Sequence, residues 1–140
     1  MGREGESPVR REGILEYALP GGWEVLVGRT DAANDRLSLE LARPDDRWFH
    51  VRALPGSHVL LRAREDAVPD RVTLELAAAI AAYHSKARGA GTVPVSCTEA
   101  RHVSKPRGAK PGTVAIRKEQ VLKVRPLSEA AAAALRPGAG

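Results

Sequence analysis

The chain has 140 residues, 43% of them hydrophobic and 28% charged, which is the composition of one soluble globular domain. Its single cysteine, Cys97, excludes an internal disulfide. The sequence contains neither an apolar run that could span a bilayer nor the apolar stretch of a secretory signal. We therefore expect a cytoplasmic protein with no membrane partner.

The net charge is +5 and the isoelectric point is about 9.9. The positive charge is concentrated between Arg101 and Arg125, where eight basic residues stand against one acid, Glu119. This segment therefore carries +7 and the rest of the chain −2. Localised positive charge is what a phosphate-binding surface requires. The alternative is a solvated set of lysine- and arginine-rich loops.

The chain begins with a polar segment and two predicted strands. Residues 1–12 are charged and contain glycine and proline, so we expect them to be disordered. Strands are predicted over residues 14–19 and 23–27, on either side of a Pro-Gly-Gly turn. Residues 31–41 then predict a short helix, which Asp31 is placed to cap and which ends before the next proline.

Residues 47–54 and 58–62 are rich in branched and aromatic side chains and predict a hairpin around the Pro55-Gly56 turn. The turn is followed by Ser57 and His58, which would place a hydroxyl and an imidazole beside exposed backbone N–H groups. Such a turn can hold a phosphate. The alternative is an ordinary hairpin turn in which Ser57 bonds to its own backbone.

The first strand of this hairpin has a polar face. Side chains alternate along a strand, so Trp48, His50 and Arg52 point one way. The core side would be formed by Phe49, Val51 and Ala53. Unpaired bases stack on indole and imidazole rings, and phosphates pair with arginine, so the polar face is a candidate RNA-binding surface. The alternative is that Trp48 is a core or edge residue and His50 is simply hydrogen-bonded.

The second half of the chain predicts one dominant helix over about residues 70–87. Its apolar stripe is predicted to consist of Val72, Leu76, Ile80 and Tyr83. A strand follows over residues 93–98, and then a Pro/Gly-rich basic loop over residues 105–112. Residues 113–116 and 120–124 predict a closing pair of strands, and residues 127–140 a short helix or disordered tail.

The predicted fold is α+β, with a mixed, mainly antiparallel sheet packed against the dominant helix and accompanied by a short helix. The folded domain is expected to span residues 13–126. No internal repeat is present.

Metal and hydrolase sites are poorly supported by spacing. The possible ligands lack the spacing of a zinc site; they are Asp46, His50, His58, His84, Cys97 and His102. There is no Gly-x-Ser-x-Gly nucleophile elbow, P-loop or dinucleotide-binding fingerprint. Ser57 and His58 are adjacent on a strand and face opposite sides. We therefore expect no metal, no cofactor and no catalytic residue.

Several motifs occur in a fixed order along the chain. They are Gly28-Arg29 followed by Asn34-Asp35, Asp46-x-Trp48-Phe49-His50, Pro55-Gly56-Ser57-His58-Val59, Ala81-Ala82-Tyr83-x-Ser85-Lys86, and VSKPRGAKPG at residues 103–112. In these motifs the chain resembles the NFACT-R domain, the RNA-binding module of fibronectin-binding-protein-like ribosome quality-control factors. The resemblance covers about residues 22–125. Thr30 and Ser38 stand where Asn and Thr are expected, and both keep a short polar side chain.

The resemblance implies an RNA-binding protein that performs no chemistry and recognises tRNA or ribosomal RNA, with the large ribosomal subunit as a possible partner. The residues expected to bind RNA are Arg29, Asn34, Asp35, Asp46, Trp48, His50, Arg52, Ser57, His58, Lys86, Arg101, Lys105, Arg107 and Lys110. It also implies that the two hairpin motifs form one site, in which Trp48, His50 and His58 converge, Asp46 orients a histidine, and the basic loop lies nearby.

Two alternatives remain open. One is a small hydrolase or nuclease that uses Asp46, His50, Ser57 and His58. The other is a protein adaptor on a ribosome-associated complex, which a broad exposed apolar patch would favour. The full-length factors also contain an N-terminal NFACT domain, a helix-hairpin-helix segment and a coiled coil, which we do not expect in 140 residues. A protein partner that supplies these segments is a further expectation.

Overall fold

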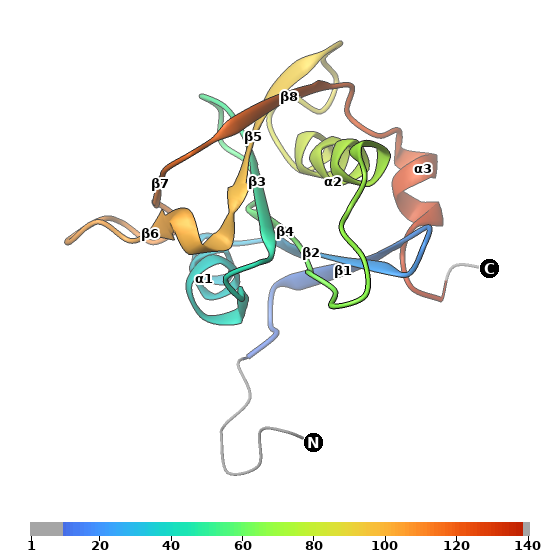
Figure 1. Ribbon diagram of the computed structural model, residues 1–140. Coiled ribbons are helices and arrows are strands. Elements are labelled where there is room, and N and C mark those ends of the chain that lie inside the picture. Colours follow the sequence, from blue (N-terminus) through green and yellow to red (C-terminus); the bar gives the residue numbers. More distant parts are fainter. Residues whose placement is uncertain (1–9, 139–140) are drawn as a thin grey trace.

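The computed structural model describes residues 10–138. Their largest unit is a six-stranded sheet with the strand order β1-β2-β4-β3-β5-β8 (Figure 1). The strands are β1 (Ile14–Leu19), β2 (Trp23–Gly28), β3 (Arg47–Val51), β4 (Val59–Leu61), β5 (Val93–Glu99) and β8 (Gln120–Val124). Every pairing in this sheet is antiparallel, which confirms the predicted α+β fold and the β3–β4 hairpin.

The remaining elements are short, apart from one helix. They are α1 (Asp31–Arg36), its π-helical continuation η1 (Leu37–Leu41), α2 (Arg71–Tyr83), the 3-10 turn η2 (Ala100–His102), β6 (Val103–Ser104), β7 (Ala115–Ile116) and α3 (Glu129–Ala134). β6 and β7 form a separate two-stranded sheet. Most of the sequence predicted to be disordered at the N-terminus, residues 1–9, lies outside the described residues.

The two faces of the sheet pack against different helices, and strand alternation sorts the side chains between them. On one face, Val25, Phe49 and Val95 belong to the main core against α2. On the other, Leu26 and Leu60 pack with Leu37 and Leu41 of η1. α1 and α2 therefore lie on opposite sides of the strands (Figure 1).

Helix α2 ends earlier than predicted, and its buried face includes other residues than the predicted apolar stripe. It ends at Tyr83, three or four residues early, because the carbonyl of His84 accepts the Ser57 N–H at 2.9 Å instead of continuing the helix. Val72 is 70% exposed, so it is not part of the core stripe. The buried face is formed largely by alanines around Ile80, which let the helix lie close to the sheet.

Two other predictions were wrong in detail. The side-chain cap of α1 is Thr30, whose hydroxyl accepts the Ala33 N–H at 3.0 Å, and Asp31 is the first helical residue. The predicted closing strands do not pair with each other: β7 pairs with β6, and β8 pairs with β5. Residues 117–119 between them include Lys118 at φ 56°, a left-handed backbone that turns the chain from one sheet to the other.

Gly28 allows α1 to pack directly on β2. A Cβ atom at this position would lie 3.0 Å from both the backbone N and the Cα of Asn34. Since these are backbone atoms, the helix itself would have to shift. We predict that Gly28→Ala lowers the free energy of unfolding by about 1–3 kcal/mol. Urea denaturation measures this change. Gly89→Ala, where a Cβ would meet nothing within 4 Å, is the control and should change stability far less.

Candidate nucleic-acid interface

Asp46 lies at one end of the sheet and has a structural role. It is 1% exposed, and its carboxylate accepts hydrogen bonds from Arg62 Nη1 at 2.9 Å, Ala63 N at 2.7 Å and Arg43 N at 2.8 Å. Arg62 also donates to the carbonyl of Leu41 at 2.8 Å. The expectation that Asp46 orients a histidine was therefore wrong. Its carboxylate therefore binds the Arg62 side chain and the backbone just before β3, at Arg43, and just after β4, at Ala63.

The hairpin motifs do bring three aromatic rings together, as predicted. The ring centroids of Trp48 and His58 are 5.2 Å apart, those of His50 and His58 5.5 Å, and those of Trp48 and His50 6.0 Å. Trp48, however, is 3% exposed. Its indole is packed inside the protein, so in this structure its face is not available to stack on a base.

A chain of buried hydrogen bonds runs through this cluster. Trp48 Nε1 donates to the Ser38 hydroxyl at 2.8 Å, and the same hydroxyl lies 2.7 Å from His58 Nδ1. His58 Nε2 lies 3.1 Å from the carbonyl oxygen of Gly112. A carbonyl can only accept, so Nε2 carries the hydrogen and Nδ1 accepts from Ser38. Each group therefore has a defined donor or acceptor role.

These roles require a neutral imidazole, and burial favours one. Burial, followed by the nearby His50, lowers the pKa of His58 to about 4. Burial also lowers the pKa of His50. At neutral pH His58 is thus uncharged and works as a hydrogen-bonding bridge between Ser38 and the loop that contains Gly112.

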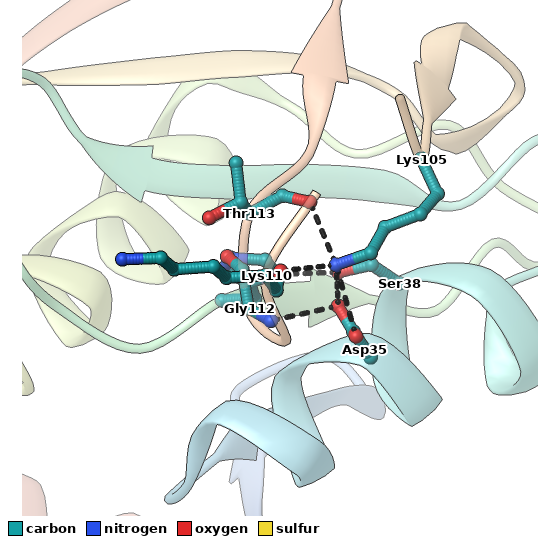
Figure 2. Close-up of polar contacts among 7 residues, drawn as sticks. Asp35, Ser38, Lys105, Lys110, Gly112 and Thr113 are labelled. Atoms are coloured by element: carbon teal, nitrogen blue, oxygen red, sulfur yellow. Dashed lines mark hydrogen bonds and ion pairs between the residues drawn. The ribbon is translucent and has the colours of Figure 1, made fainter. Parts of the chain in front are cut away.

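The basic loop is held against α1 by Asp35. One carboxylate oxygen lies 3.1 Å from Lys105 Nζ, and the other accepts the Gly112 N–H at 3.0 Å. Lys105 Nζ also donates to the carbonyls of Thr113, at 3.0 Å, and Lys110. Figure 2 shows this arrangement, with the Lys105 ammonium at its centre. We call these contacts, together with the His58–Gly112 bond, the loop clamp.

The clamp separates two kinds of lysine in the loop. The Lys105 ammonium is bound to groups within the protein. The Lys110 side chain points away from these contacts (Figure 2) and is exposed. Arg107 is exposed as well. The basic loop projects beside α1 (Figure 1), and the clamp holds its backbone while Arg107 and Lys110 remain exposed.

The structure gathers most of the predicted site residues at the end of the sheet where β2 ends and β4 begins. They are Arg29, Asn34, Asp35, His50, Arg52, Ser57, His58, Lys86, Lys105 and Lys110. Asn34 accepts the His58 N–H at 3.0 Å, and the Ser57 and Lys86 N–H groups bond across the Pro55 turn to His84 and Pro55. Asp46 and Arg101 lie at the other end, where Arg101 pairs with Asp45 and Glu99.

A cavity of about 310 Å³ opens between the sheet and residues 112–119. Its lining includes His50, Arg52, Ser96 and Glu119. Arg52 Nε lies 3.4 Å from Glu119 Oε2, and Ser96 also donates to this carboxylate. The positive charge of Arg52 is thus paired with the carboxylate of Glu119, the single acid of the basic segment.

Ser38 and Gly112, which connect the clamp to the core, were not predicted as site residues from the sequence. One signal was available: Ser38 lies four residues after Asn34, so both fall on the same side of the helix. Nothing in the sequence marks Gly112 as the acceptor of an imidazole 54 residues away.

The hydrolase constellation is not assembled, because Asp46 lies away from the histidines and is bonded to Arg62. Within residues 10–138, no group of three or more His, Cys, Asp or Glu side chains is placed to hold a metal ion. No helix in the same range has the length and apolarity needed to cross a membrane.

Comparison with known proteins identifies the family of this chain. The chain matches the family described as the NFACT protein RNA binding domain over residues 17–118. It belongs to the NFACT-R family. Among its relatives, Rqc2 homolog RqcH of Bacillus subtilis (strain 168) is 44% identical over 114 residues, which are 81% of this chain and 20% of that protein. Rqc2 homolog RqcH of Streptococcus suis (strain 05ZYH33) is 39% identical over 112 residues, 80% of this chain and 20% of that protein.

A solved structure shows the same NFACT-R fold. The C-terminal part of the fibronectin/fibrinogen-binding protein from Streptococcus suis superposes with a TM-score of 0.83 at 35% identity, covering 96% of this chain and 53% of that one. The NFACT-R chain described here spans about a fifth of the length of the two RqcH relatives.

The neutral His58 bridge predicts a specific dependence on pH. The folded-state pKa is depressed, so between pH 6.5 and about 4 the unfolded chain binds a proton here that the folded chain does not. The stability contributed by this group is complete above pH 6.5 and is lost as the pH falls towards 4, at up to about 1.4 kcal/mol per pH unit. NMR titration of the His58 ring should give a midpoint near 4 in the folded protein and near 6.5 in urea. Equal midpoints would contradict the bridge.

Proposed function

We propose that this chain binds structured RNA and that the clamped loop supplies its main contact with the phosphate backbone. The observation that carries the proposal is the loop clamp, in which Asp35 and His58 fix the base of a loop whose outer cations, Arg107 and Lys110, face solvent. A fixed loop loses little conformational freedom when it binds, so more of its electrostatic attraction appears as affinity.

The electrostatics of the chain support this proposal. Arg107 and Lys110 have no carboxylate within 4.0 Å in the part of the chain that the structure describes. Unpaired surface cations displace condensed counterions when they meet phosphates, and this release drives sequence-independent binding. Glycines in the loop, such as Gly108 at φ 76°, allow its backbone to approach an RNA strand closely.

The finer assignment follows from the relatives. Two of them are named Rqc2 homolog RqcH, and the family is described as RNA-binding. We propose that the RNA is tRNA or large-subunit ribosomal RNA, that the process is ribosome quality control in the cytoplasm, and that the chain acts as a binding module without chemistry of its own. A protein partner that supplies other NFACT segments is part of this proposal.

Replacing the outer cations tests the proposal. We expect Arg107→Ala and Lys110→Ala each to weaken binding to all RNAs, and each to lower the slope of log affinity against log salt concentration by about 1. Binding is measured with purified tRNA, a large-subunit ribosomal RNA fragment and duplex DNA of similar length, over a salt series.

The matched control is Arg71→Ala, which removes the same charge from the exposed first turn of α2, where Arg71 pairs with Glu75. It should leave the RNA affinity nearly unchanged. Equal binding of duplex DNA and RNA by the unaltered protein, or equal effects of Lys110→Ala and Arg71→Ala, would contradict the proposal.

A further inference from the structure

A second group of cations surrounds a half-buried tyrosine–histidine pair at the end of α2. The Tyr17 hydroxyl lies 2.7 Å from Nε2 of His84, and their ring centroids are 5.7 Å apart. Tyr17 is 3% exposed, and Tyr83 packs edge-on against His84 with centroids 5.0 Å apart. This pair is separate from the His58 network and plays no part in the loop clamp.

Two arginines are held over these rings. Arg88 Nε donates to the carbonyl of Tyr83 at 2.7 Å, and its guanidinium lies 3.9 Å from the centroid of the Tyr83 ring. Arg136 Nε donates to the carbonyl of Glu16 at 2.9 Å, and its guanidinium lies 5.5 Å from the Tyr17 ring. In residues 10–138, both guanidiniums bond to protein only through Nε. Their terminal amino groups are therefore oriented in advance and available to a ligand.

No carboxylate in the described residues forms an ion pair with Arg88, Arg136 or Arg29. After burial, the positive charges of Arg88, Arg29 and Arg136 are what lower the pKa of His84, to about 4. Three cations near one imidazole repel one another, and an anion between them would relieve that repulsion.

A cavity of about 450 Å³ adjoins the cluster. It is lined by Pro55, Gly56, His84, Ser85, Lys86 and Arg88, so it presents an ammonium and a guanidinium. Gly56 is required for this shape, because a Cβ there would lie 2.8 Å from the Cβ of Ser85. The cavity thus lies between the hairpin turn and the end of α2, beside the predicted phosphate-holding turn.

We propose that this cluster, centred on Arg88 and Arg136 and including Lys86 and Arg29, is a second site for a phosphate group of bound RNA. Guanidinium groups pair with phosphate oxygens through two parallel hydrogen bonds, which their fixed orientation favours. The site deepens the proposed function and rests on it.

The position of the cluster favours an RNA backbone over a free phosphate compound. Ser57, whose N–H bonds to the carbonyl of His84, is followed directly by His58, which holds Gly112 of the clamp. The two cationic surfaces lie on opposite faces of the sheet, and these two consecutive residues connect them at one end of it. A single RNA with several phosphates can reach both, whereas a small anion would occupy one.

The first experiment compares two double variants with equal loss of charge. Arg88→Gln with Arg136→Gln should weaken binding to purified tRNA about tenfold and lower the salt slope by about 1.5–2. Arg64→Gln with Arg71→Gln is the control. Arg64 also lies over an aromatic ring, Trp23, but at the opposite end of β2. Circular dichroism and urea unfolding establish that each variant is folded, and Arg88→Lys with Arg136→Lys, which keeps the charge, should retain part of the affinity.

The second experiment uses His84 as a reporter of the anion. Saturating tRNA should raise the pKa of His84 above about 4, as followed by NMR of its ring, because a bound phosphate stabilises the charged imidazole. The rise should persist in Lys110→Ala, which removes a loop contact. It should be absent from the Arg88→Gln, Arg136→Gln variant.

The outcomes separate the two proposals. If Lys110→Ala weakens tRNA binding while the Arg88 and Arg136 variants match the control and His84 does not respond, the second site is wrong and the proposed function stands. If inorganic pyrophosphate raises the pKa of His84 and tRNA does not, the site takes a free phosphate compound and its assignment to RNA is wrong. If the protein does not bind tRNA at all, the proposed function fails first.

Discussion

The hydrogen bonds that run from Trp48 through Ser38 and His58 to Gly112 are the interaction on which the rest of the site depends. The indole can only donate and the carbonyl can only accept, so the hydroxyl and the neutral imidazole between them must each do both. Loss of any one member leaves a buried polar group unpaired, at a cost of about 1–3 kcal/mol. The network therefore fixes the sheet, the η1 turn and the basic loop relative to one another.

Internal hydrogen bonds and ion pairs reduce the number of basic residues that can bind a phosphate. Several cations that contribute to the net charge are committed to internal partners: Lys105 to Asp35, Arg62 to Asp46 and Arg101 to Asp45. The cations that remain available are fewer, and they lie on fixed supports such as the clamped loop and the aromatic rings of Tyr83 and Tyr17. A count of basic residues thus locates the surface only approximately, whereas the hydrogen bonds decide which cations can meet a phosphate.

Much of the fold could be predicted because its signals are local. Short runs of strand-forming residues between turn signals located β2, β3 and β5, and the apolar periodicity of residues 70–87 located α2. The end of α2 and the partners of β7 and β8 could not be predicted, because each depends on hydrogen bonds to another segment of the chain. The same holds for Trp48: its place on the strand was evident, but its burial and its hydrogen bond to Ser38 of η1 were not.

The sequence by itself determined the family, the α+β class and the residue types of the site, since these follow from ordered motifs, periodicity and composition. Only the tertiary structure decided the role of each side chain. Asp46 proved to be the partner of Arg62, His58 a neutral bridge, and Lys105 part of the clamp. Arg88 and Arg136 became one cluster only through folding, because β1 passes beneath the end of α2. The physical reason is that hydrogen bonds and ion pairs form between atoms a few ångströms apart in space, whatever the separation along the chain.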